Sequence, residues 1–176
     1  MRKLIAAACA LPLLACTPAP TQANSGQSDS AETGGDVADV GAMEVSRASV
    51  RPPSGGSGDR FTGNVTITPL FDPKGSSQVG AALVRFEPGA RTAWHKHPLG
   101  QRLVLLQGTG WTQVEGGPIE AIRAGDVVWC PPDVRHWHGA TPTSAMAHIA
   151  IQEAENGSPV EWMEHVPDEL YRSGPA

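Results

Sequence analysis

Two histidines separated by one residue lie in the stretch GARTAWHKHPLGQ at residues 89–101. Successive side chains on a β-strand point to opposite faces, so His95 and His97 share a face and converge on one point. Gln101 follows across the turn PLG, and His136 stands in a second segment, GDVVWCPPDVRHWHG. The imidazole groups of these histidines are typical ligands of divalent transition metals. The alternative is a pair of exposed histidines on an edge strand.

A second polar pair occurs in TSAMAHIAIQE at residues 143–153. On a strand, His148 and Gln152 share one face. If that face is internal, His148 is a candidate general base, because its unperturbed pKa lies near neutrality. If it is external, His148 makes only an ordinary surface hydrogen bond. In VGAALVRF, the small residues Ala82 and Val84 share a face and leave room for a ligand.

The elements that must position these residues are short strands. From Phe61 onward, short apolar runs are separated by Gly, Pro and Asp, and GTG, EGGP, AGD and PPD are predicted turns. This texture predicts an all-β sandwich or barrel, with a short helical tail in VEWMEHVPDELYR. The predicted strands are VTITPLF, VGAALVRF, TAWHKH, LVLLQG, WTQVE, IEAIRAG, DVVWC, HWHGA and MAHIAIQ.

The N-terminal region has a different composition. Residues 1–15 begin with Arg2 and Lys3, continue in an apolar run and end before Cys16, which resembles a bacterial lipoprotein signal. Cys16 would then be lipidated, and the domain would face the periplasm from a lipid anchor in the cell envelope. The alternative is an ordinary signal peptide. We expect a flexible tether over 16–60, a barrel domain over 61–158 and a tail packing on it over 159–176.

The charge and the cysteine content of the chain limit the kinds of partner that it can bind and the source of its stability. The formal net charge is −5 and no basic cluster is present, so nucleic acid is an unsuitable partner. After removal of the signal and apart from Cys16, Cys130 is the single remaining cysteine, so stability must come from a packed core rather than an internal disulfide. We expect a small-molecule substrate, and membrane contact only through the lipid anchor.

Two motifs resemble those of the cupin family. The first runs through Gly89, His95, His97, Gln101 and Gly108, and the second through Gly125, Pro131, Asp133 and His136. The resemblance implies a double-stranded β-helix barrel, jelly-roll-like in form, whose metal is held by His95, His97, Gln101 and His136. Most cupins carry glutamate where Gln101 stands. Four neutral ligands cancel none of the ion's charge, which favours Lewis-acid chemistry on an anionic oxygen.

From about Phe61 to Arg172 the chain resembles small cupins with manganese-dependent (R)-selective hydroxynitrile lyase activity. FEPGARTAWHKHPLGQ, GDVVWCPP, HWHGA and WMEHV carry this resemblance. It implies reversible cleavage of an aromatic cyanohydrin to an aldehyde and hydrogen cyanide. It also implies one divalent metal per chain, manganese first, with iron, zinc, nickel or cobalt as alternatives. The residues implied to line the active site are Ala82, Val84, His148 and Gln152.

Other functions fit the same ligands. An iron-dependent dioxygenase would use the two open coordination positions for substrate and O₂, and a non-catalytic module would capture a small ligand at the cell envelope. His138 shares a strand face with His136 and lies either beside the metal or at the barrel mouth. An open barrel leaves a sheet edge that a second subunit can cover, so we expect a homo-oligomer, either a dimer or a tetramer.

Overall fold

The computed structural model describes residues 41–176. The predicted signal at 1–15, Cys16 and the predicted tether through residue 40 lie outside the described residues. The chain divides into two units, Met1–Met43 and Glu44–Ala176, and every element below belongs to the second. Within the described range, no helix combines the length and the hydrophobicity that crossing a bilayer requires.

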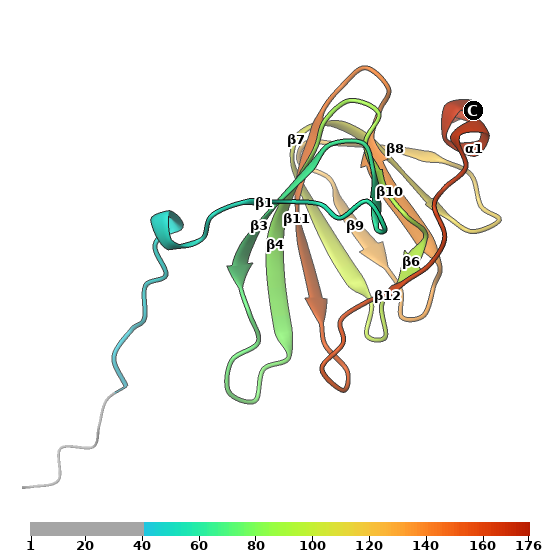
Figure 1. Ribbon diagram of the computed structural model, residues 1–176. Helices are drawn as coiled ribbons and strands as arrows, with labels where there is room; N and C mark the ends of the chain where they lie inside the picture. Colours follow the sequence, from blue (N-terminus) through green and yellow to red (C-terminus); the bar gives the residue numbers. More distant parts are fainter. Residues whose placement is uncertain (1–40) are drawn as a thin grey trace, which may run out of the picture. The chain divides into compact units, whose positions relative to one another are not determined.

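The second unit consists almost entirely of short strands (Figure 1). A 3₁₀ helix, η1, spans Ala48–Val50, and a short α-helix, α1, spans Asp168–Ser173. The strands are β1 (Ser54–Gly55), β2 (Phe61–Thr62), β3 (Val65–Phe71), β4 (Val79–Phe86), β5 (Arg91–Thr92), β6 (His95–Lys96), β7 (Gln101–Val114), β8 (Glu120–Arg123), β9 (Val127–Cys130), β10 (His136–Ala140), β11 (Met146–Glu153) and β12 (Glu161–Trp162).

The strands form one curled antiparallel sheet. Its main path runs β1-β3-β4-β11-β7-β10-β5-β2, with β9 and β8 also paired to β7, and β6 pairing with β10 and β12. Strand β7 belongs to both halves, since its first half pairs with β11 and β9 and its second half with β10 and β8. This confirms the predicted all-β barrel with a short C-terminal helix.

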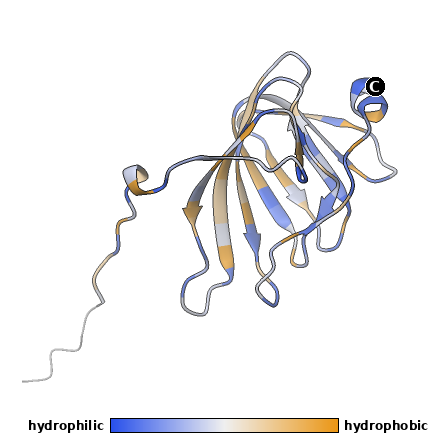
Figure 2. Cartoon of the chain, in the orientation of Figure 1, coloured by the Kyte–Doolittle hydropathy of each residue, from blue (hydrophilic) through white to orange (hydrophobic). Residues whose placement is uncertain are grey.

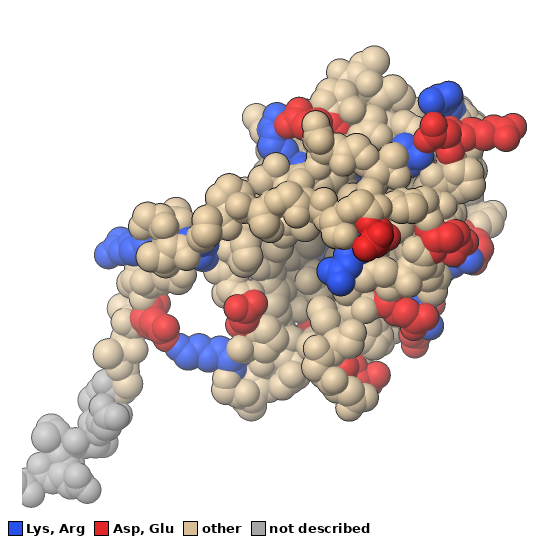
Figure 3. Space-filling view, in the orientation of Figure 1, with Lys and Arg blue, Asp and Glu red and all other residues tan. Residues whose placement is uncertain are grey.

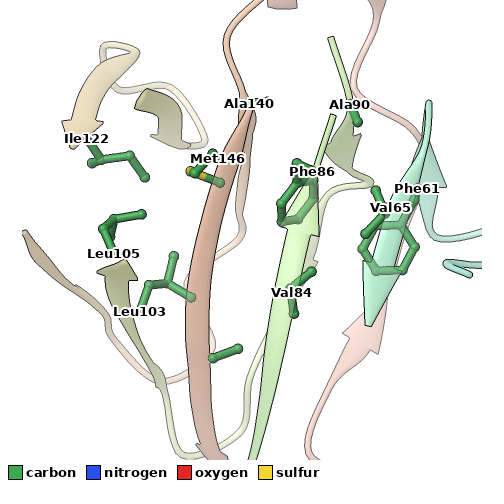
Figure 4. Close-up of a cluster of buried hydrophobic side chains, with 11 residues drawn as sticks. Phe61, Val65, Val84, Phe86, Ala90, Leu103, Leu105, Ile122, Ala140 and Met146 are labelled. Carbon is green, nitrogen blue, oxygen red and sulfur yellow. The ribbon is translucent and has the colours of Figure 1, made fainter. Parts of the chain in front are cut away.

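Alternation of side chains builds the barrel core. Leu103 and Leu105 of β7 are buried with Val84 and Phe86 of β4 and with Met146 of β11 (Figure 4). The residues between them on each strand point to the other face. Both hydrophobic and hydrophilic stretches occur along the strands (Figure 2). Cys130 is a buried free thiol, as expected, and burial raises its pKa to about 12.

The predicted turn at GTG (108–110) is wrong. Strand β7 continues through these three residues without a break, because the glycines let the strand bend without reversing its direction. We call this bend at 108–110 the β7 corner. Gly108 has φ +74°, and a Cβ at this position would overlap the carbonyl oxygen of Ala145. The register with β11 shifts between Ala147 and His148, which leaves Leu106 as the extra residue of a β-bulge.

Two further predicted boundaries differ in the structure. TAWHKH forms two short strands, β5 and β6, rather than one. The register with β10 shifts by one residue between them, and the intervening amides of Ala93 and Trp94 donate to the carbonyls of Arg60 and Glu164 instead. The predicted tether to residue 60 includes β1, which pairs with β3 through backbone hydrogen bonds. Backbone pairing needs no apolar side chains, so the polar composition of this segment did not reveal the strand.

The C-terminal tail contacts the barrel through a buried arginine. The Arg91 guanidinium is hydrogen-bonded to the Val166 carbonyl at 3.0 Å and pairs with Asp168, and it lies 4.5 Å from the centre of the Tyr171 ring. The Tyr171 hydroxyl donates to the Ala140 carbonyl at 2.8 Å. Only Asp168–Ser173 of the predicted helical tail is helical, while Glu161–Trp162 pairs with β6.

We expect Gly108→Ala to cost about 4 kcal/mol or more in free energy of unfolding, because it combines a left-handed backbone with a steric overlap in the corner. Gly116→Ala is the matched control. Gly116 has φ +76° but open space around it, so backbone strain alone should cost about 1–2 kcal/mol. Urea unfolding measures both, and equal losses would contradict the role given to the corner.

Candidate metal centre and active site

The barrel encloses a cavity of about 140 Å³. His95, His97, Gln101 and His138 line it, and the opposite wall comes from β3, β4 and β11. Apolar side chains make up much of the remaining lining, including Phe61, Ile67, Phe86, Val160 and Trp162. This is the layout of a small-molecule site, in which a few convergent polar groups stand in an apolar pocket.

Backbone carbonyls orient three of the four predicted metal ligands. The Nδ1 atom of His95 lies 3.0 Å from the Ala93 carbonyl oxygen, and that of His136 lies 2.9 Å from the Val134 oxygen. The Nδ1 atom of His97 lies 2.7 Å from the carbonyl oxygen of Pro159. A carbonyl only accepts hydrogen bonds, so each Nδ1 carries the proton and each Nε2 keeps its lone pair.

The donor atoms that remain fit a metal ion. Nε2 of His97, Nε2 of His136 and Oε1 of Gln101 are buried and have no hydrogen-bond partner. The Gln101 amide nitrogen donates to Oε1 of Gln152 at 3.3 Å, which leaves its carbonyl oxygen free to coordinate. Buried lone pairs without partners are costly, and a divalent cation is a group that such donors bind.

The imidazoles are neutral in this environment. Burial lowers the pKa of His136 to about 4, and it also lowers the pKa values of His95 and His97. Neutral imidazole is the form that binds metals. No acidic side chain lines the cavity among the described residues, so a bound divalent ion would keep its charge.

His138 adds a third histidine to a compact cluster. The ligating atoms of His95, His136 and His138 lie within 4.8 Å of one another, so this buried trio could hold a metal ion. The Nδ1 of His138, however, lies 3.3 Å from Nε2 of His148 rather than on a backbone carbonyl. The Nε2 atom of His138 is buried without a partner, as is that of His97. The motif spacing favours His97 and Gln101 as the further ligands, and the structure offers His138 as the alternative.

The other predicted site residues face the same cavity. His148 is fully buried on the inner face of β11, which decides between its two predicted orientations. Its pKa is lowered by burial to about 4. Val84 lies opposite His148 in the β4–β11 register, and Ala82 lies opposite Ala150. Gln152 also lines the cavity, where its Oε1 accepts the hydrogen bond from the Gln101 amide.

Sequence reasoning did not assign several residues of the site. The spacing of His138 two residues after His136 was the available signal, but it did not distinguish a position beside the metal from one at the mouth. Thr92 and Trp162 also line the cavity, and Trp162 comes from the tail. Nothing in the local sequence of Trp162 indicates that β12 pairs with β6.

The fold and the converging donors define a β-barrel protein with a candidate metal centre. Comparisons with known proteins agree, since residues 82–151 match the family described as the cupin domain. The chain is 55% identical over 130 residues to (R)-mandelonitrile lyase of Granulicella tundricola, which covers 74% of this chain and 99% of that protein. This chain therefore belongs to the cupin family and is similar to that lyase.

Solved structures extend the comparison. A cupin-like protein from Thermotoga maritima is 45% identical, with a TM-score of 0.66, and the match covers 69% of this chain and 92% of that chain. A polyketide cyclase from Streptomyces resistomycificus is 17% identical with a TM-score of 0.55, covering 74% of this chain and 92% of its own. The second likeness shows the shared fold alone.

Removing single donors should identify the ligand set. We expect His97→Ala and Gln101→Ala to lower metal content, because each removes a lone pair that has no other partner. Mutation of a residue that only orients a ligand typically weakens metal binding by about 10–100-fold, so loss of a ligand itself should weaken it at least as much. His138→Ala should retain the metal. Elemental analysis after loading and dialysis measures this, and loss of metal from His138→Ala with full retention in His97→Ala would assign the site to the histidine trio instead.

Acid should weaken the metal-free protein. The unfolded His148 side chain binds a proton near its ordinary pKa of 6.5, whereas the folded one does so only near 4. The unfolded state therefore binds more protons, and stability falls as pH drops through this window. At pH 5, His148 alone would account for about 2 kcal/mol of that loss relative to pH 7.

Urea unfolding of the chelator-treated protein at pH 7 and pH 5 measures this loss. His148→Gln should show a smaller difference in unfolding free energy between the two pH values. Gln152→Leu, which alters the cavity without removing a titrating group, should keep the wild-type difference. A pH dependence unchanged by His148→Gln would show that His148 is not the buried neutral base described.

Proposed function

We propose that this protein is a metal-dependent hydroxynitrile lyase, which reversibly cleaves an aromatic cyanohydrin into an aldehyde and hydrogen cyanide. The observation that carries the proposal is one small, largely apolar cavity lined by three neutral donors, His95, His97 and Gln101, and by a buried histidine pair, His138 and His148. His136 lies beside them, with a ligating atom within 4.8 Å of those of His95 and His138. The similarity to (R)-mandelonitrile lyase supports the same reaction class.

The metal would be held by His95, His97, Gln101 and His136. A bound divalent cation, with manganese as our first choice and iron, zinc, nickel or cobalt as alternatives, would supply Lewis-acid stabilisation of negative charge on the substrate oxygen. The low pKa values of the histidines keep these ligands unprotonated at neutral pH.

The His148–His138 pair supplies the proton chemistry. One ring donates a hydrogen bond to the other, so the far nitrogens, Nε2 of His138 and Nδ1 of His148, present one lone pair and one N–H. Neither far nitrogen has a protein partner. In either tautomer the pair can therefore accept the cyanohydrin hydroxyl proton and later return a proton to the departing cyanide.

The remaining residues position the substrate. The amide of Gln152 accepts from Gln101, and its own N–H groups are left to bind the substrate. Ala82 and Val84 leave space beside β11 for an aromatic ring, which Phe86 and Trp162 also border. A larger residue at Ala82 would fill this space.

Cyanide release from mandelonitrile by the manganese-loaded protein tests the proposal. His148→Ala should reduce kcat by about 10²–10⁴-fold, the usual contribution of a general base. His165→Ala is the matched control, since His165 contacts Thr62 outside the cavity, and it should retain activity. Loading with each alternative metal identifies the ion that supports turnover.

Two outcomes would count against the lyase. Release of cyanide at the same rate by wild type and His148→Ala would remove the role of the histidine pair. Oxygen consumption with iron, together with no cyanide release under any metal, would favour the dioxygenase alternative.

A further inference from the structure

A second and larger cavity adjoins the candidate active site at one end of the barrel. Its volume is about 540 Å³, and Ile67, Ala82 and Gln152 line both this cavity and the inner one of about 140 Å³. The loop between β3 and β4 and the loop between β11 and β12 lie at this end of the barrel and contribute to the lining (Figure 1). We call this space the outer cavity.

The inner cavity has room for little more than one ring. An apolar protein cavity of about 150 Å³ holds a single benzene molecule, whereas small-molecule sites usually have about 300–1,000 Å³. The inner and outer cavities together fall within that range. The space available to the far end of a larger substrate is therefore the outer cavity, beyond Ala82 and Gln152.

Two side chains of opposite charge, Arg60 and Asp72, line the outer cavity. The Arg60 guanidinium lies 5.8 Å from the centre of the Trp162 ring, and Trp162 also lines the inner cavity. Asp72 follows Phe71, the last residue of β3, which lines the outer cavity but not the inner one. Arg60 is therefore the charge that contacts a wall of the inner cavity.

The Arg60 side chain has no salt-bridge partner in the part of the chain that the structure describes. Its main chain is held in place, because its N–H donates to the Ser57 carbonyl at 3.0 Å and its carbonyl accepts from the Ala93 N–H at 2.8 Å. A guanidinium presents five N–H donors in a plane and binds a carboxylate through two parallel hydrogen bonds. The chemistry of Arg60 therefore favours a carboxylate.

We propose that Arg60 and the outer cavity bind a carboxylate at the far end of the substrate. This inference rests on the proposed function, because it names the substrate class of the same site. The substrate is an aromatic cyanohydrin whose ring carries a carboxylate opposite the reacting carbon. The ring passes Ala82 and Trp162, and the carboxylate pairs with Arg60. Asp72 repels the carboxylate and limits its affinity, while a cationic group in the same place would be repelled by Arg60.

The cyanohydrins of 4-carboxybenzaldehyde and of its methyl ester test the proposal, because they differ in charge but little in shape. The metal-loaded full chain should cleave the carboxylate with the higher kcat/KM. Arg60→Gln should lower the ratio of the two kcat/KM values by about fivefold, the contribution of an exposed ion pair. Asp72→Asn should raise this ratio, because it removes the repelling charge.

Arg102→Gln is the matched control. Arg102 also lies over a tryptophan ring, 4.4 Å from the centre of Trp129, but it lines neither the inner nor the outer cavity. Its substitution should leave the ratio at the wild-type value. A ratio that Arg60→Gln does not change, or that Arg102→Gln lowers equally, would overturn the proposal.

Binding of 4-(hydroxymethyl)benzoate and of its methyl ester, followed by calorimetry without cyanide, separates this proposal from the proposed function. Binding of the carboxylate that Arg60→Gln weakens, in a protein that releases cyanide from no cyanohydrin, would support the Arg60 site and contradict the lyase. Cyanide release without any preference for the carboxylate would contradict the Arg60 site and leave the lyase standing.

A measurement on the wild-type chain holds even if Arg60→Gln fails to fold. Salt screens exposed charges, and at about 1 M the screening length is only about 3 Å. The preference of wild type for the carboxylate should therefore decrease as salt is added, while binding of the ester should change little. A preference that stays constant up to this concentration would overturn the proposal.

Discussion

The orientation of three imidazoles by backbone carbonyls is the constraint on which this site depends. Each carbonyl holds the proton on Nδ1, so the Nε2 lone pairs of His95, His97 and His136 are all available. Two of these carbonyls lie two residues before their histidine, and the third belongs to Pro159 in the tail. The tail is therefore part of the centre, because it determines the tautomer of His97.

The same cavity combines two histidine environments with different chemistry. One group is anchored to the main chain, which favours a fixed ligand geometry. The other, His138 with His148, is hydrogen-bonded side chain to side chain at 3.3 Å, which leaves the proton free to occupy either ring. Burial lowers the pKa values of both groups. The largely apolar lining therefore keeps the histidines of both groups unprotonated, so that the ligands can bind a cation and the His138–His148 pair can accept a proton.

The charge distribution is consistent with a small-molecule function. On the face drawn in Figure 3, acidic and basic side chains are interspersed and form no basic patch. Long-range attraction to nucleic acid is therefore unsupported on that face. Ion pairs such as Arg135–Glu115 lie at the surface, where solvent screens them, so they contribute little to stability.

Local pattern alone determined the shared face of His95 and His97, because alternation on a strand is a property of the backbone. It also predicted the short strands, the buried Cys130 and the polar residues at Gln101 and His136, with the motif spacing indicating the family. Tertiary structure decided whether His148 faced inward, where His138 lay, and that Trp162 and Pro159 reached the site. These positions depend on which strands pair across the barrel. Pairing between segments that are distant in the sequence leaves no periodic pattern in the sequence of either segment.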